Sequence, residues 1–266
     1  AKACKGKKMV VIGTSFIGLE VAAFGVSKGE ATSVDVVGQS PTPFARVFGA
    51  AIGARMTKMH EEKGVKFHFN TSVSEFQGSN GKLQKVILKN GKTLEADVCV
   101  VGIGVNASTE FANDCGAKMT TKGSIVVDKY LKACNDIYVG GDVASFPLQM
   151  LGGEYVTIGH WQLSHAHGRT AALNMLGKDK EVNTVPFFWT MQYGHASQFD
   201  DIIIEGSVDD LAFVAYYVKG NDILGVATAG KDPIAAHAAN HLYNGNMPKA
   251  DEIRADPSKW HQSVAA

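Results

Sequence analysis

The feature that most constrains the fold is a glycine-rich turn that joins a short apolar run to a helical pattern. The apolar run covers 9–12, the turn covers 13–18, and the helical pattern covers 16–27. A second apolar run, 33–37, ends at Gly38. A strand, a glycine turn, a helix and a second strand in this order form a βαβ unit, which is built on a parallel sheet. The pattern therefore predicts an α/β fold with a Rossmann-type parallel sheet.

An antiparallel insertion is expected within this sheet. Residues 73–94 alternate between apolar and polar side chains, and they contain Asn-Gly pairs at 80–81 and 90–91. Asn-Gly between two β-like runs is typical of a hairpin, so the segment is interpreted as a meander. A buried parallel strand over 97–102 then completes a first domain, 1–104. In the helix of the βαβ unit, spacing places Ile17, Val21 and Phe24 on one face.

Two further units follow the first. Residues 105–180 contain short strands and a helix that is expected over 158–176. Residues 181–266 are rich in aromatic side chains, and they predict an α+β C-terminal domain. A helix is expected there from Pro233, with Asp232 as its N-cap, because proline favours the first helical position and aspartate the cap.

The glycine turn has the spacing of a dinucleotide-phosphate loop. Gly13 makes the tight turn, Gly18 lets helix and strand pack closely, and a pyrophosphate rests on the helix N-terminus. Two positions depart from this pattern: Ser15 replaces the second glycine, and the second strand ends at Gly38 instead of a carboxylate that holds the ribose diol. We therefore expect NAD(P)H to bind weakly, and Ser15→Gly combined with Gly38→Glu to raise its affinity. The alternative is a Rossmann-like turn that binds no ligand. An arginine that would bind a ribose phosphate in place of the carboxylate is not obvious, and Arg46 is the nearest one.

Composition excludes several classes of partner and site. Lys plus Arg and Asp plus Glu number 26 each, so there is no bulk attraction to nucleic acid or to an anionic membrane. No apolar run is long enough for a membrane span. The four cysteines show no disulfide spacing, which favours an intracellular, reducing compartment, and none forms a C-x-x-C pair, which argues against a thioredoxin-reductase-type dithiol. His237 and His241 have a metal-compatible spacing, but two ligands do not make a site, so no metal is expected.

Five motifs in order along the chain resemble one flavoprotein family. They lie at 10–23, 97–104, 138–144, 159–162 and 185–189. They resemble apoptosis-inducing-factor-like and oxygenase-type ferredoxin reductases, and the second and fourth are most similar to the mitochondrial apoptosis-inducing factor 3 branch. The resemblance implies a glutathione-reductase-like two-dinucleotide fold and an intracellular, mitochondrial location.

The resemblance also implies a function and site residues. The function is an FAD-dependent NAD(P)H oxidoreductase that passes hydride from nicotinamide to flavin, and electrons on to an iron–sulfur protein or a quinone. The catalytic residues are Glu20, which positions the nicotinamide carboxamide, and Trp161, whose helix points its N-terminus at the flavin. The cofactor-binding residues are Gly13, Ser15, Phe16, Ile17, Gly18, Gly38, Gly102, Ile103, Gly104, Gly141, Asp142, His160 and Trp189. A solvated glutamate, a core tryptophan and a turn aspartate remain the alternatives for Glu20, Trp161 and Asp142.

The chain departs from the family because it contains a single glycine loop of the dinucleotide type. It also contains no C-x-H pair, so no Rieske cluster domain is expected in it. Within the family, 1–104 corresponds to the NAD(P)-binding domain, 105–180 to the second half of the FAD-binding domain, and 181–266 to the interface domain. The polar segment before the first strand is short, so we expect the N-terminus to be a cut, a processing point or a gene boundary. The N-terminal flavin-binding half is therefore expected to be missing, and FAD to bind only when that half is present.

The aromatic C-terminal segment is expected to meet another polypeptide, either the missing flavin half or another subunit. A sheet this small cannot cover both of its faces alone, and the segment has many aromatic residues that bury a large apolar area: Phe187, Phe188, Trp189, Phe213, Tyr216 and Tyr217. The alternative is that the helix from Pro233 and the tail through Trp260 fold back over it. Two functions remain open: part of an active reductase, or a degenerate, inactive relative that serves as a scaffold or subunit.

Overall fold

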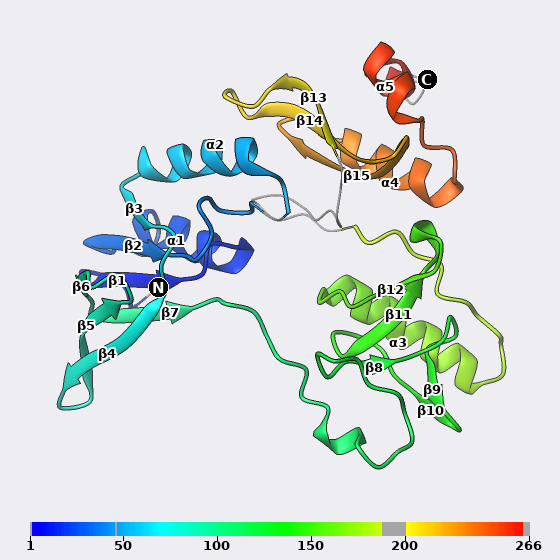
Figure 1. Cartoon of the computed structure of the whole chain (residues 1–266), viewed down its shortest axis with the longest axis horizontal. Helices are drawn as coiled ribbons and strands as arrows, with labels where there is room; N and C mark the ends of the chain where they lie inside the picture. The colour runs from blue at the N-terminus through cyan, green and yellow to red at the C-terminus, as the bar shows by residue number, and fades with distance from the viewer. Residues whose placement is uncertain (1, 46, 188–200, 263–266) are drawn as a thin grey trace.

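The first unit is built on a parallel sheet. Figure 1 shows the computed structural model of the chain, which describes residues 2–45, 47–187 and 201–262. The sheet has the strand order β3-β2-β1-β7. Its strands are β1 (Lys8–Ile12), β2 (Ser33–Val37), β3 (Val65–His68) and β7 (Val98–Val101). Helix α1 (Phe16–Val26) follows β1, and α2 (Ala50–Glu61) precedes β3. The predicted Rossmann-type sheet is thus confirmed, with element ends shifted by one or two residues.

Helix α1 packs against the sheet through its small residues. Its buried residues are Gly18, Leu19, Ala22 and Gly25. A Cβ atom on Gly25 would lie 2.2 Å from Cε of Met9, and one on Gly18 would lie 2.0 Å from the carbonyl oxygen of Gly13. Ile17 is exposed, so the face that it shares with Val21 and Phe24 is not the one most deeply buried. The close approach of helix and strand therefore occurs at the two glycines, Gly18 and Gly25, on the buried face of α1.

The antiparallel meander lies on one side of this sheet, as predicted. It consists of β4 (Val73–Ser79), β5 (Lys82–Leu88) and β6 (Thr93–Glu95), paired in the order β4-β5-β6. Asn80 and Gly81 both have positive φ angles, which is the geometry of a tight hairpin turn. Val86 and Leu88 of the meander are buried in a cluster with Val10 and Val37 of the parallel sheet.

The middle unit is a second, smaller assembly of strands around one helix. Its strands are β8 (Ile125–Val126), β9 (Lys132–Cys134), β10 (Ile137–Tyr138), β11 (Ala144–Leu148) and β12 (Glu154–Val156), with 3-10 turns η1 (Glu110–Ala112) and η2 (Gln149–Leu151). Strand β11 pairs parallel with β8 and antiparallel with β12. Helix α3 (Trp161–Met175) begins three residues later than expected, because His160 is its N-cap with an extended backbone.

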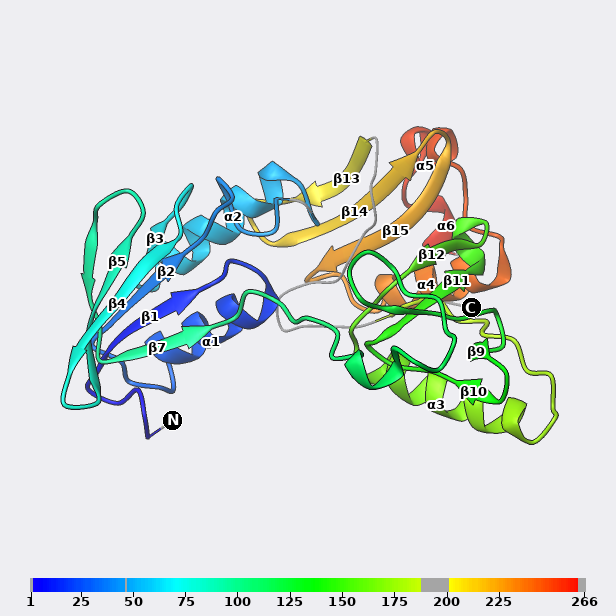
Figure 2. The ribbon, with the colours of Figure 1, turned by 60° about the horizontal axis from the view of Figure 1, so that its bottom comes forward.

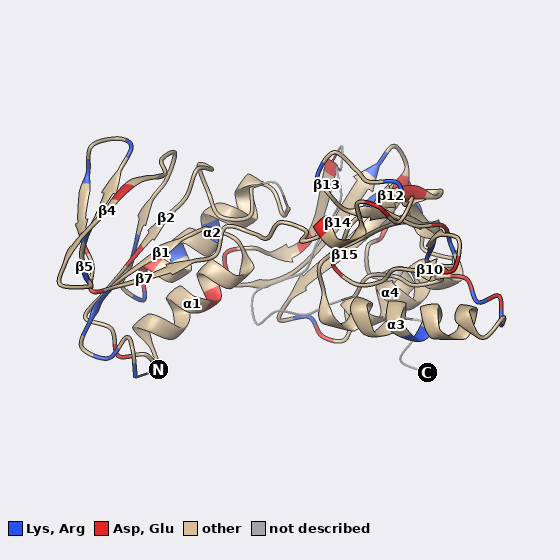
Figure 3. Cartoon of the chain, turned by 90° about the horizontal axis from the view of Figure 1, so that it is seen from below, with Lys and Arg blue, Asp and Glu red and all other residues tan. Residues whose placement is uncertain are grey.

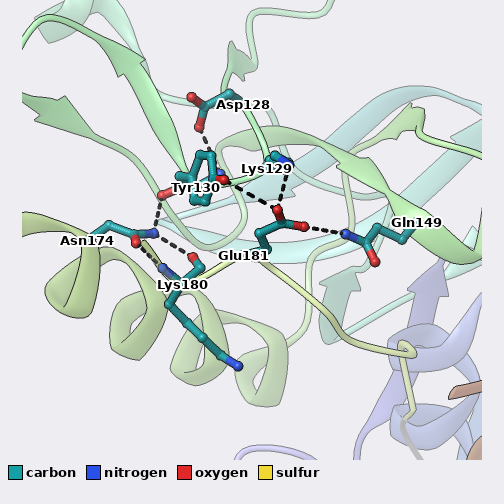
Figure 4. A network of polar contacts seen from close by, with 7 residues as sticks. All are labelled: Asp128, Lys129, Tyr130, Gln149, Asn174, Lys180 and Glu181. Carbon is teal, nitrogen blue, oxygen red and sulfur yellow. Dashed lines mark hydrogen bonds and ion pairs between the residues drawn. The ribbon is translucent and has the colours of Figure 1, made fainter. Parts of the chain in front are cut away.

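A polar network fixes the chain after α3 (Figure 4). The Asn174 side chain donates hydrogen bonds to the carbonyl oxygens of Tyr130 and Lys180, both at 2.7 Å, and accepts one from the Lys180 N–H at 2.6 Å. Glu181 forms an ion pair with Lys129 and accepts a hydrogen bond from Gln149 at 2.9 Å. The network returns the chain to the middle unit before it enters the C-terminal segment.

The C-terminal unit is an antiparallel sheet covered by helices. Strands β13 (Asp201–Ser207), β14 (Ala212–Lys219) and β15 (Asp222–Ala229) are followed by α4 (Ile234–Asn244), α5 (Ala250–Ala255) and α6 (Lys259–Gln262). The sequence pattern did not predict β13, α5 or α6. The N-cap of α4 is Pro233 and not Asp232, so the expected aspartate cap was wrong.

Strand β14 is buried on both faces. Phe213 and Tyr217 belong to the core that contains Phe48, next to α2, whereas Tyr216 packs in a separate cluster with Trp260. Figure 2 shows β13 and β14 beside α2. The expected open apolar surface on this sheet was therefore wrong for the described strands. The alternative, in which the helix after Pro233 and the tail fold back over one face, is what the structure shows.

Surface charge is distributed without a dominant sign. In the view of Figure 3, Lys and Arg are interspersed with Asp and Glu along both halves of the molecule. None of the helices in the described ranges combines the length and apolarity needed to cross a membrane.

Candidate functional site

Two glycine loops meet at the carboxyl ends of β1 and β7. Gly13 has a φ angle of 118°, and a Cβ atom there would lie 2.2 Å from the carbonyl oxygen of Gly102. The Gly102 N–H donates to the Ile12 carbonyl at 2.7 Å, which holds the two loops in register. Only glycine fits position 13, so the backbone itself forms the surface beside α1 there.

A pocket of about 440 Å³ opens at these loops. Its lining residues are Ile12, Gly13, Thr14, Ser15, Val37, Gly38, Gln39, Ser40, Phe44, Ala45, Val47, Thr71, Ser72, Gly102, Ile103 and Gly104. None of these side chains is ionisable. The pocket has the size of a small-molecule site, and it lies where parallel sheets bind ligands, at the carboxyl ends of the strands.

The N-terminus of α1 faces this pocket. Ser15 is the N-cap residue, with φ −101° and ψ −167°, and its side chain makes no capping hydrogen bond. The first turn of α1 contains no acidic residue, so the helix dipole favours an anion there. A Cβ on Gly13 would collide with the Gly102 carbonyl, so glycine at position 13 lets the two loops meet beside this helix end. The N–H groups at the start of α1 therefore border the pocket at a place that fits a pyrophosphate.

The end of β2 carries Gly38 where a typical NAD site has a carboxylate that binds the ribose. The Gly38 N–H donates to the His68 carbonyl at 3.0 Å, and the Gly38 carbonyl accepts from the Thr71 N–H at 3.1 Å. A Cβ atom on Gly38 would lie 2.4 Å from Cγ2 of Thr14. The Thr14 side chain therefore occupies the space that a side chain at position 38 needs. Arg46 lies outside the described residues.

The pocket brings together part of the predicted nucleotide-binding set. It includes Gly13, Ser15, Gly38, Gly102, Ile103 and Gly104. Phe16 packs instead against Phe44 and Phe48, with ring centroids 4.8 and 5.9 Å apart. Glu20 is exposed on α1, outside the lining. Sequence reasoning missed Thr14, Gln39, Ser40, Thr71 and Ser72, although the last two follow β3 at the same carboxyl edge and could have been found by that rule.

A second set of predicted residues surrounds the N-terminus of α3. The Ser164 hydroxyl donates to Oδ1 of Asp142 at 3.2 Å, and the Gly141 N–H donates to Nδ1 of His167 at 3.1 Å. His167 is fully buried, and burial lowers the pKa of its imidazole. A neutral ring can accept the Gly141 hydrogen bond, so His167 holds the Gly140-Gly141-Asp142 turn against α3.

The same region is open to solvent on one side. Trp161 is 59% exposed at the start of α3, and its ring lies 5.5 Å from that of His165 and 6.0 Å from that of His160. Asp142 is also exposed. Trp189, which was predicted to reach a cofactor here, lies outside the described residues.

An apolar cavity of about 470 Å³ lies between the middle and C-terminal units. Strands β11 and β12 line one side, and β15 and α4 line the other. The described residues that line it carry no ionisable side chain. Within the described ranges, no cluster of three metal-binding side chains is present.

Comparison with known proteins connects these features to one family. A model for pyridine nucleotide-disulphide oxidoreductases matches residues 1–168. Apoptosis-inducing factor 3 from Homo sapiens is 40% identical over 257 residues, which cover 94% of this chain and 42% of the relative. Rhodocoxin reductase from Rhodococcus erythropolis is 32% identical over 256 residues, which cover 93% of this chain and 58% of the relative. The chain thus spans only part of the length of these relatives.

Solved structures share the fold. The putidaredoxin reductase in its covalent complex with putidaredoxin matches with a TM-score of 0.89 at 24% identity, over 99% of this chain and 64% of that one. A ferredoxin reductase from Rhodopseudomonas palustris matches with a TM-score of 0.83 at 29% identity, over 92% of this chain and 62% of that one. The resemblance and the fold class inferred from the motifs are both confirmed. With its paired glycine loops, its parallel sheet and inserted meander, and a family match across most of its length, the chain belongs to the pyridine nucleotide-disulphide oxidoreductase family.

Proposed function

We propose that these residues form the NAD(P)H-binding unit and one wall of the flavin site of an FAD-dependent oxidoreductase. In this proposal, hydride passes from nicotinamide to flavin, and electrons pass on to an iron–sulfur protein or a quinone. The observation that carries it is the pocket at the glycine loops, where α1 presents its N-terminus to a ligand. The names rhodocoxin reductase and ferredoxin reductase among the relatives support an iron–sulfur acceptor.

The proposed roles divide between two units. Residues 1–104 bind the nicotinamide nucleotide, with Glu20 of α1 positioning the carboxamide. Residues 105–180 hold part of FAD, with Asp142 accepting hydrogen bonds from its hydroxyl groups and the N-terminus of α3 at Trp161 facing its ring. Residues 181–266 form the interface domain. Bound FAD supplies the hydride-accepting ring, and the protein supplies position and electrostatics.

The wall at α3 needs a second wall, which we place outside these 266 residues. Exposed apolar side chains mark where it docks: Val105 is 88% exposed, Phe111 is 82% exposed, and Trp161 lies at the α3 wall itself. We therefore propose that the missing flavin half docks on this region and not on the C-terminal sheet. A mitochondrial location stays a prediction from the resemblance, which cell fractionation would test.

Two binding measurements test the proposal. Calorimetric titration should show weak binding of NADH to the purified chain, because the pocket fits a pyrophosphate but provides no carboxylate for the ribose. FAD added to the chain should be lost on desalting, since only one wall of its site is present and tight binding needs both. Stoichiometric flavin absorbance after desalting would contradict the missing-half part of the proposal.

A second candidate is a degenerate relative that acts as a scaffold or subunit. The closed position at Gly38, which lacks a ribose-binding carboxylate, favours it. The same titration separates the candidates: absence of binding for both NADH and ADP at millimolar concentration would support the scaffold and contradict the reductase.

A further inference from the structure

The strongest unexplained feature of the nucleotide pocket is the side chain of Thr71. This residue follows β3, and its N–H donates to the carbonyl of Gly38 at 3.1 Å. It therefore lies directly beside the end of β2, the position from which a Rossmann domain ordinarily supplies the acidic residue for the ribose. Thr71 lines the pocket but is only 7% exposed.

The hydroxyl of Thr71 has no hydrogen-bond partner within the described part of the chain. A buried hydroxyl without a partner is unfavourable by about 1–3 kcal/mol, so such groups are rare and usually have a ligand or a functional reason. The backbone N–H of Thr71 already donates to Gly38, so its side-chain hydroxyl is the group that can form a hydrogen bond with a ligand in the pocket.

The surroundings indicate what this hydroxyl recognises. Position 38 cannot carry an acid without displacing Thr14, whose Cγ2 would lie 2.4 Å from a Cβ there. The other lining residues near the end of β2 are the uncharged Gln39, Ser40 and Ser72. A hydroxyl both donates and accepts, so it can pair with a ribose hydroxyl without a formal charge.

We propose that Thr71 is the anchor of an uncharged ribose subsite, which binds the adenosine ribose of a nicotinamide dinucleotide in place of the usual carboxylate. The inference rests on the proposed function, because it assumes that the pocket binds this class of ligand. The pyrophosphate lies at the N-terminus of α1, and the adenosine ribose extends from there toward Gly38 and Thr71. Thr71 thereby sets which end of the pocket accepts adenosine.

Substitution of Thr71 tests the proposal on the full chain. Thr71→Val removes the hydroxyl at nearly constant shape, and it should weaken binding of NADH and of ADP by about five- to tenfold, the value of one neutral hydrogen bond. Binding of reduced nicotinamide mononucleotide, which lacks adenosine, should not change. Thr71→Ala should give a similar loss, and Thr71→Ser should bind within about twofold of the parent chain.

Thr42→Val is the matched control. The Thr42 hydroxyl is also buried and has no hydrogen-bond partner among the described residues, but it does not line the pocket. Its removal should leave NADH affinity unchanged. Unchanged NADH affinity in Thr71→Val and Thr71→Ala, or an equal loss in Thr42→Val, would overturn the role of Thr71 while leaving the proposed function standing. If the parent chain bound neither NADH nor ADP, the proposed function would fail, and this inference with it.

Discussion

Thr14 decides which side chain position 38 can carry. Threonine is stiff about χ1, so Cγ2 of Thr14, 2.4 Å from a Cβ on Gly38, cannot simply rotate away. As long as Thr14 is kept, Gly38→Glu should therefore lower the denaturation temperature and should not raise NADH affinity. Adding Ser15→Gly should not change this result. The double variant Thr14→Ala with Gly38→Glu should bind NADH several-fold more tightly than Gly38→Glu. Calorimetry of the three variants checks this, and a gain in affinity from Gly38→Glu alone would contradict it.

His167 should make the middle unit sensitive to acid. Burial lowers the pKa of His167 in the folded protein below its unfolded value of about 6.5. Between these two values the unfolded state binds more protons, so stability falls as pH drops below about 6.5 toward the folded pKa. The slope is at most about 1.4 kcal/mol per pH unit.

His167→Gln tests this dependence, because glutamine can still accept the Gly141 hydrogen bond but does not titrate. Its melting temperature should fall less between about pH 7.5 and pH 5 than that of the parent chain. His165→Gln is the control, because His165 lies two residues before His167 on α3 and is exposed. This variant should keep the parent chain's dependence of melting temperature on pH. An identical slope in His167→Gln would show that another group is responsible.

At the scale of the element, Asn174 secures the end of α3. Its side chain serves three backbone groups, of Tyr130 and Lys180, at 2.6–2.7 Å, and it is almost fully buried. Asn174→Ala leaves these groups without partners and should destabilise the chain by about 2–4 kcal/mol. Asn244→Ala removes one exposed bond to Asn240 and should be nearly neutral. Chemical denaturation measures both, and equal midpoints for the two variants would contradict the role of the network.

Two helix glycines make a matched pair. A Cβ on Gly25 of α1 would meet Cε of Met9 at 2.2 Å and Cγ2 of Val34 at 3.0 Å, whereas one on Gly168 of α3 has nothing within 4 Å. Gly25→Ala should destabilise by about 1–3 kcal/mol through overpacking. Gly168→Ala should stabilise by up to about 1 kcal/mol through helix propensity. Stabilisation by both substitutions would show that α1 is free to move away from the sheet.

For the whole molecule, the C-terminal sheet shares a core with the first unit. Phe48 and Tyr217 belong to one cluster, with ring centroids 6.4 Å apart, and Trp260 lies in the cluster on the other face of β14. Phe48→Leu and Tyr217→Leu should show a coupling energy of about 0.5–1.5 kcal/mol in a double-mutant cycle. Phe48→Leu and Trp260→Leu should be additive. Additivity in the first pair would mean that the two units do not pack together in solution.

Local features could be predicted from the sequence because they depend on neighbours in the chain. The positive φ angle at Gly13, the hairpin at Asn80-Gly81 and the period of the apolar residues each reflect constraints within a few positions. The βαβ unit, the meander and the glycine loop of the candidate site follow from these constraints. Gly102, in contrast, was predicted from the resemblance of residues 97–104 to a motif of the family, and the structure places its carbonyl against Gly13.

The tertiary structure decided which faces are buried and which side chains share the pocket. The spacing of apolar residues shows that α1 has distinct faces. Only the packing distance between α1 and β1 determines that Gly18 and Gly25 lie on the face that contacts the sheet. The pairing of Thr71 with Gly38, and the burial of Tyr216 and Tyr217 on opposite faces of β14, join segments far apart in the chain. Such contacts depend on how elements pack, and a local pattern carries no information about the partner that an element will meet.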